Sequence, residues 1–137
     1  MLRLDLVDGR AQEVLRASDV ALCKPGTSTL EAALLGCPVV VAARSSWLTE
    51  KILRRLVRVD SLAMPNLIAG KPIVPEYYQN DADPERIADS LLALLEGPER
   101  QQQLDALRVV AESLSRGGAA RRAAEIASEM IVERIAA

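Results

Sequence analysis

The chain has 137 residues, and half of them are hydrophobic, which is enough for one domain with a buried core. Its 17 basic and 19 acidic residues give a net charge of −2, which argues against nucleic-acid binding by phosphate neutralisation. Because the chain has no histidine, it has no histidine-based triad and lacks the commonest general base and metal ligand. Catalysis must use carboxylates or groups outside this chain.

The two cysteines, Cys23 and Cys37, have no C-x-x-C spacing, so neither a zinc site nor a disulfide framework is indicated. The first residues lack the basic and apolar blocks of a signal peptide. No apolar run approaches the roughly 18 residues that span a bilayer. We therefore expect a cytoplasmic protein or one that lies on a membrane surface.

The first sixty residues alternate between strand and helix patterns. Strands are predicted over 2–7, 20–23 and 38–43, and helices over 10–17 and 28–35. Gly36 is placed to close the second helix, and the valines that follow are apolar on both faces, as in a buried parallel strand. The alternation predicts βαβ units and therefore an α/β fold with a parallel sheet.

The turn between the second strand and the second helix is the most informative motif. Gly26 lets the backbone approach a ligand, and Thr27 to Thr29 open a helix whose unpaired N–H groups and positive dipole end favour a phosphate. Glu31, four or five residues into the helix, is placed to accept hydrogen bonds from a ribose. The alternative is a structural capping box between Ser28 and Glu31, and the sequence leaves both open.

Residues 47–58 form a basic amphipathic helix pattern, which fits a crossover helix on the sheet or contact with anionic lipid. From 64 to 79 three prolines argue against a continuous helix or central strand. Asn66, Glu76 and Gln79 lie among them, either facing a ligand or in a plain connecting loop.

Asp83 followed by Pro84 predicts a helix N-cap and a helix over 84–96. This role accounts for the second acid of the Asp81-Ala82-Asp83 motif, so we predict no metal and no cofactor. From 98 onward the chain is helical, with a break at 117–118 and a last helix over 120–135 that carries an apolar stripe. That stripe predicts a homodimer if nothing else covers it.

Four segments in order resemble the nucleotide-binding part of lipid-A-disaccharide synthases, glycosyltransferases with two Rossmann domains. They are Val7-Asp8-Gly9-Arg10, then 18–36 with Gly26-Thr27-x-Thr29-Leu30-Glu31, then Arg44 after the valine strand, and Pro65-Asn66-Leu67-Ile68-Ala69-Gly70-Lys71-Pro72-x-Val74-Pro75-Glu76-x-x-Gln79. The resemblance implies a partial Rossmann-like parallel sheet flanked by helices, with a UDP-sugar-binding domain at 1–97, incomplete at its N-terminus, and a C-terminal helical tail at 98–137.

The resemblance further implies an inverting transfer of diacylglucosamine from UDP to a diacylglucosamine 1-phosphate at the inner face of the cytoplasmic membrane. It assigns UDP binding to Gly26, Thr27, Thr29, Glu31 and Arg44, and the substrate cleft to Asn66, Glu76 and Gln79, with Asn66 the candidate catalytic residue. The general base is expected in an N-terminal domain that this chain lacks, so we expect the isolated chain to be inactive.

Two alternatives remain on sequence alone. One is another UDP-sugar transferase of the same architecture that acts on a lipid-linked acceptor, and the other is a non-catalytic α/β interaction module. The proline-rich segment argues against the first. The missing catalytic groups favour the second, whereas the polar proline-rich segment does not.

Overall fold

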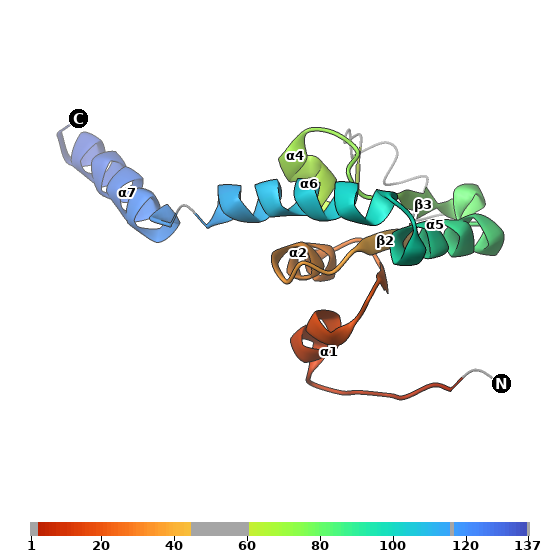
Figure 1. Ribbon diagram of the computed structural model, residues 1–137. Coiled ribbons are helices and arrows are strands. Elements are labelled where there is room, and N and C mark those ends of the chain that lie inside the picture. Colours follow the sequence, from red (N-terminus) through yellow and green to blue (C-terminus); the bar gives the residue numbers. More distant parts are fainter. Residues whose placement is uncertain (1–2, 45–60, 116, 137) are drawn as a thin grey trace.

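The computed structural model describes residues 3–44, 61–115 and 117–136. Three strands, β1 (Ala21–Cys23), β2 (Val39–Ala43) and β3 (Glu76–Tyr78), form a parallel sheet in the order β1-β2-β3 (Figure 1). The register places Cys23 beside Val41 and Val41 beside Glu76. Because the strands are parallel, their carboxyl ends lie at one edge of the sheet.

Helices cover both faces of this sheet. They are α1 (Ala11–Ala17), α2 (Thr27–Leu34), α4 (Met64–Ala69), α5 (Pro84–Glu96), α6 (Glu99–Leu114) and α7 (Ala119–Ala136), with a 3-10 turn η1 (Gln79–Asp81) after β3. Helices α2, α4 and α6 contact one another on one face. A hydrogen bond of 2.6 Å between Tyr77 Oη and Ser90 Oγ ties α5 to the opposite face. Helix α7 extends away from this body (Figure 1).

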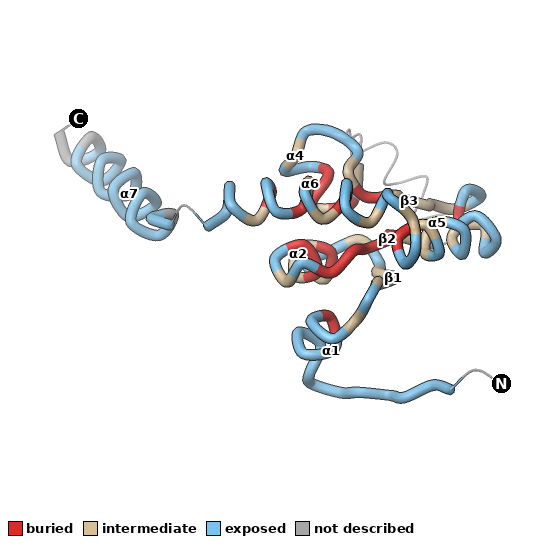
Figure 2. The backbone as a smooth tube through the Cα atoms, viewed as in Figure 1, coloured by how far each residue is buried: buried red, intermediate tan, exposed pale blue. Residues whose placement is uncertain are grey.

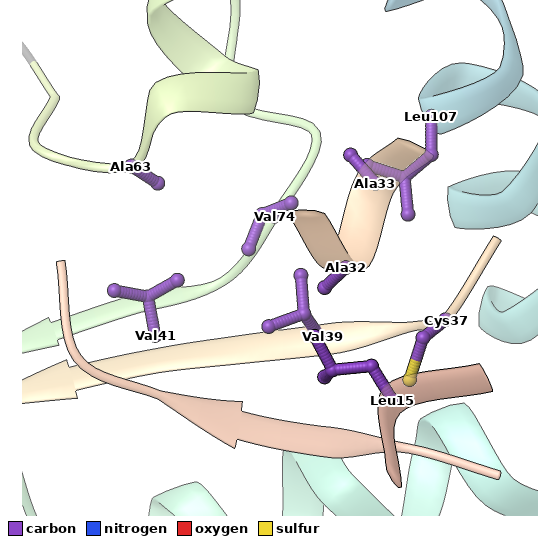
Figure 3. Packing of buried hydrophobic residues seen from close by; sticks show 9 residues of the cluster. All are labelled: Leu15, Ala32, Ala33, Cys37, Val39, Val41, Ala63, Val74 and Leu107. Atoms are coloured by element: carbon purple, nitrogen blue, oxygen red, sulfur yellow. The ribbon is translucent and has the colours of Figure 1, made fainter. Parts of the chain in front are cut away.

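The core lies between β2 and the helices α2 and α6. Val39 and Val41 point to the same side of β2, Val39 towards Ala32 of α2 and Val41 towards Ala63 (Figure 3). Ala32 and Ala33 are small enough for α2 to approach the sheet closely. Leu107 of α6 is fully buried against this cluster. Burial is concentrated in β2 and the parts of α2 and α6 that face it, whereas α7 is exposed (Figure 2).

A buried glutamine takes the place of a neighbouring strand at the start of β2. Gln103 of α6 accepts a hydrogen bond of 2.7 Å from Val39 N and donates one of 3.2 Å to Val39 O. The register begins the β3 pairing two residues later, at Val41. The side-chain amide thus satisfies backbone groups that β3 does not reach.

We expect Gln103→Leu to lower the free energy of unfolding by about 2 kcal/mol, because it keeps the volume but leaves both polar groups of Val39 buried without a partner. Urea unfolding measures the change. Gln102→Leu, at an exposed neighbouring position, is the matched control and should change the value little. Equal effects of the two variants would contradict the pairing with β2.

Most predicted elements are confirmed, including the parallel sheet and the helices on both sides of it. Gly36 follows the last turn of α2 with φ 70°, the left-handed conformation that a C′ glycine supplies. Asp83 caps α5, and its carboxylate accepts hydrogen bonds from Glu85 N at 2.8 Å and Arg86 N at 3.4 Å. The N-cap at Asp83 and the left-handed glycine at position 36 both depend on neighbouring residues in the sequence, which is why they could be predicted.

One prediction about local structure is wrong, and a second missed two short elements. Residues 3–7 form no strand, and Leu4 and Leu6 are 84% and 96% exposed. Their alternation fits a strand, but no neighbouring strand among the described residues supplies the hydrogen bonds. Residues 64–79 are also more regular than predicted, because Pro65 lies in the first turn of α4, where a missing N–H costs nothing, and β3 begins directly after Pro75.

The predicted basic helix over 47–58 lies outside the described residues. Within the parts of the chain that are described, no helix combines the length and apolarity needed to cross a bilayer. The predicted division at residue 97 stays a prediction, although α6 contributes Leu107 to the same core as α2.

Candidate functional site

Three groups of predicted site residues follow the carboxyl ends of the three strands. The turn at Gly26 follows β1, Arg44 follows β2 and Gln79 follows β3. In open parallel sheets ligands bind at this edge, beyond the ends of the strands. The topology therefore places these groups along one edge.

The first turn of α2 has the features of an anion site. Gly26 is the N-cap, with φ 146° and ψ −165°, a conformation that is essentially restricted to glycine. A Cβ built there would meet nothing within 4 Å, so the space above the turn is open. Among the described residues no hydrogen bond uses the N–H groups of Thr27 or Ser28. These amides are available to a ligand.

Thr29 and Ser28 hold the turn itself. Thr29 is fully buried, and its hydroxyl donates a hydrogen bond of 2.7 Å to Gly26 O. Ser28 Oγ lies 3.4 Å from Lys24 O, to which it donates. The alternative capping box is wrong, because α2 begins at Thr27 and Gly26, not Ser28, is its N-cap. Glu31, the fifth helical residue, is half-buried, and its carboxylate has no partner among the described residues.

The other two predicted residues at this edge are Arg44 and Gln79. Arg44 is exposed, and its Nη2 donates a hydrogen bond of 2.9 Å to Ala82 O. Gln79 has φ 53°, and within the described ranges it is the one non-glycine residue with a positive φ. Such a conformation costs of order 1–3 kcal/mol and is found mainly where surrounding structure or function requires it.

A cleft of about 820 Å³ lies beside α4 and β3. The described residues that line it are Ser61, Asn66, Leu67, Gly70, Lys71, Pro72, Val74, Pro75, Glu76 and Tyr78. Asn66 and Glu76 both line it, and their predicted part in a substrate cleft stays a prediction. The UDP-binding candidates on α2 are not among these lining residues, and neither are Arg44 and Gln79.

The Glu76 carboxylate is the centre of a hydrogen-bond network in this cleft. It accepts from Ser61 Oγ, from Leu62 N at 3.0 Å, from Ala63 N at 3.1 Å, from Asn66 Nδ2 at 2.6 Å and from Tyr78 Oη at 2.5 Å. Burial raises the pKa of Glu76, but the donated hydrogen bonds outweigh it and leave the pKa below its usual value. The carboxylate is therefore ionised and saturated with donors.

The Tyr78 hydroxyl is fixed as a donor by the same network. Burial and the neighbouring Glu76 carboxylate raise its pKa well above the ordinary value. Sequence reasoning placed Tyr78 in the polar cluster around the prolines but assigned it no role, and it missed Ser61. The signal for Tyr78 was its position two residues after Glu76 in a strand, which puts both side chains on one face; nothing in the sequence pointed to Ser61.

The acidic pair at 81 and 83 serves the helix that follows it. Asp83 caps α5, and Asp81 Oδ1 lies 3.4 Å from Arg86 Nη1. Across the described residues, no three side chains from His, Cys, Asp and Glu gather as metal ligands would.

The chain is an α/β protein with the fold of a Rossmann-like fragment. It has a parallel sheet, helices on both faces of the sheet and a glycine turn at the carboxyl edge. A family model described as "Lipid-A-disaccharide synthetase" matches residues 1–131. The chain belongs to this family.

Curated relatives support the same assignment. The chain is 49% identical over 125 residues to a lipid-A-disaccharide synthase of Anaeromyxobacter dehalogenans, and the match covers 90% of this chain and 33% of that protein. It is 46% identical over 126 residues to that of Azotobacter vinelandii, covering 91% and 32%, and 38% identical over 134 residues to that of Burkholderia thailandensis, covering 98% and 34%. The chain spans about a third of the length of these relatives.

Proposed function

We propose that this chain is the donor-binding portion of a lipid-A-disaccharide synthase, which transfers diacylglucosamine from UDP to a diacylglucosamine 1-phosphate, with inversion and release of UDP. The observation that carries the proposal is the first turn of α2, where an open glycine and unpaired amides occur within a family match covering residues 1–131. The general base belongs, in this proposal, to the part of the relatives that the chain does not span.

The reaction needs stabilisation of the negative charge that grows on UDP as the glycosidic bond breaks. The N–H groups of Thr27 and Ser28 and the positive end of the α2 dipole supply it without rearrangement. Arg44, at the end of the next strand, adds a cation near the diphosphate. Glu31 accepts hydrogen bonds from the ribose, and Gln79, at the end of β3, is a candidate contact in the substrate cleft.

The role of Asn66 as a contact for sugar or acceptor, expected from the sequence, is no part of this proposal, because its amide makes all of its hydrogen bonds within the chain. The donor and acceptor both carry acyl chains, so the enzyme works at the inner face of the cytoplasmic membrane, with residues 47–58 as the candidate contact surface. Helix α7 exposes Ile126, Met130, Ile131 and Val132, which favours a homodimer through this helix.

Calorimetric titration of the chain with UDP and with AMP tests the proposal. We expect UDP to bind with a Kd of about 1 mM, equivalent to about 4 kcal/mol, because few contacts of the chain reach the nucleotide in this proposal, and AMP to bind more weakly. Residues 1–131 can also replace the matching third of the Anaeromyxobacter dehalogenans relative, and the hybrid should make the disaccharide. A hybrid that folds but is inactive, together with no UDP binding by the chain, would contradict the proposal.

We expect Glu31→Gln to weaken UDP binding about tenfold, because a neutral amide accepts hydrogen bonds from the ribose less strongly than a carboxylate. The free energy of unfolding should change by no more than about 0.5 kcal/mol, since the carboxylate has no described partner. Titration calorimetry and urea unfolding measure the two effects. The control is Glu112→Gln on exposed α6 surface, which should leave UDP binding unchanged.

A further inference from the structure

The Asn66 side chain has no hydrogen-bonding capacity left for a ligand. Its amide can donate two hydrogen bonds and accept two. Nδ2 donates to Val74 O at 2.9 Å and to Glu76 Oε1 at 2.6 Å, while Oδ1 accepts from Ile73 N at 2.7 Å and Val74 N at 2.8 Å. The residue is only 3% exposed. All four bonds are therefore made within the chain.

Through Glu76 this amide is connected to two further segments. The carboxylate holds residues 61–63, where the chain returns to the sheet, and Tyr78 at the end of β3. Tyr78 pairs with Ala43, directly before Arg44, and directly precedes the left-handed Gln79. The network thus fixes both strand ends that carry the candidate ligand contacts at the carboxyl edge.

We infer that Asn66 and Glu76 form a positioning clamp, which holds the loop at 73–74, residues 61–63 and the end of β3 in place and touches no ligand itself. Its effect on UDP binding, exerted through Gln79 and Arg44, rests on the proposed function. The clamp replaces the role of Asn66 as a direct contact with sugar or acceptor. The clamp also explains why the Glu76 carboxylate lies in this cleft without a cationic partner among the described residues, since five hydrogen-bond donors satisfy it.

Asn66→Asp tests the clamp, because it places a second carboxylate against Glu76 in place of the Nδ2 donor. Two carboxylates this close hold one proton between them or repel each other. We expect the urea midpoint of Asn66→Asp to fall well below that of the unmodified chain at pH 7.5 and to recover as the pH is lowered to 5. The recovery follows because the shared proton restores a hydrogen bond.

Asn66→Ala is the matched control. It lacks the new carboxylate, so its pH dependence reports every other group that titrates between pH 5 and 7.5. Tyr78 and Lys71, which line the same cleft, are present in both variants. Its midpoint should stay low at both pH values. An Asn66→Asp midpoint that is unchanged at pH 7.5, or that shows no recovery beyond this control, overturns the clamp.

The double variant Asn66→Asp/Glu76→Gln exchanges donor and acceptor and removes the charge pair. Its midpoint at pH 7.5 should exceed that of Asn66→Asp alone, which keeps the test decisive even if the single variant does not fold. A double variant that is no more stable than Asn66→Asp contradicts the inference.

Two further measurements separate positioning from a purely structural role. In Asn66→Asp the backbone NMR signals of Gln79 and Arg44 should shift at pH 7.5 and return towards their original positions at pH 5, and UDP affinity should return with them. Signals that never shift mean that the network does not position the edge. A recovered midpoint with UDP binding still tenfold weaker means that Asn66 contacts the ligand. If the unmodified chain binds no UDP and the hybrid enzyme folds but is inactive, the proposed function fails, whereas the midpoints and the NMR signals still decide the clamp.

Discussion

Leu107→Ala is expected to lower the free energy of unfolding by about 3 kcal/mol, the largest effect on stability that we predict for a single substitution. Leu107 is fully buried where α6 meets α2 and the valines of β2. Truncation removes apolar contacts and leaves a cavity, because α2 is already close to the sheet and cannot move in to fill it. Urea or thermal unfolding of the chain measures the loss.

The control for this prediction is Val109→Ala on the same helix. Val109 is 66% exposed, so the substitution should change the free energy of unfolding by less than about 0.5 kcal/mol. A loss at position 109 as large as that at 107 would mean that α6 does not pack on the sheet through Leu107.

Gly26→Ala is expected to weaken UDP binding by at least about tenfold and to lower the free energy of unfolding by about 1–3 kcal/mol. The space for a Cβ is open, so the stability loss comes from the backbone conformation, whose φ is 146°. The binding loss comes from the methyl group, which occupies the space that a phosphate needs to reach the amides of α2. Calorimetry with UDP and urea unfolding report the two effects separately.

Gly36→Ala at the other end of α2 is the matched control. Its φ of 70° is also costly for alanine, and a Cβ there also meets nothing within 4 Å. We expect a comparable loss of stability with no effect on UDP binding. Equal weakening of binding in both variants would show that Gly26 acts only through the stability of α2.

Local signals predicted much of this fold. Asp83-Pro84 and Gly36 mark helix ends through their own backbone preferences. The valines of β2 were placed in a buried strand because the run is apolar on both faces. The missed features depend on long-range partners. Residues 3–7 alternate correctly but lack a neighbouring strand, and β3 exists because Val41 N donates to Pro75 O and aligns the next residues with β2.

The candidate site shows the same limit. Gly26 and the hydroxyl residues after it were found because a turn and a helix start are local, and their part in binding stays a prediction. Asn66 and Glu76 were found as polar residues in a loop, but which atoms they bond could not be predicted, since the donors come from residues 61–63 and from Tyr78. In the structure, the Asn66 amide makes all of its hydrogen bonds within the chain, whereas the Glu31 carboxylate has no partner among the described residues.

The position of β1 at the end of the strand order has a practical consequence for handling the chain. Its outer backbone groups meet no described strand, and Leu22 beside them is 54% exposed. Exposed strand edges of this kind recruit further strands from other molecules. During purification, aggregation of the isolated chain should therefore increase with protein concentration, and a lysine at position 22 should reduce it.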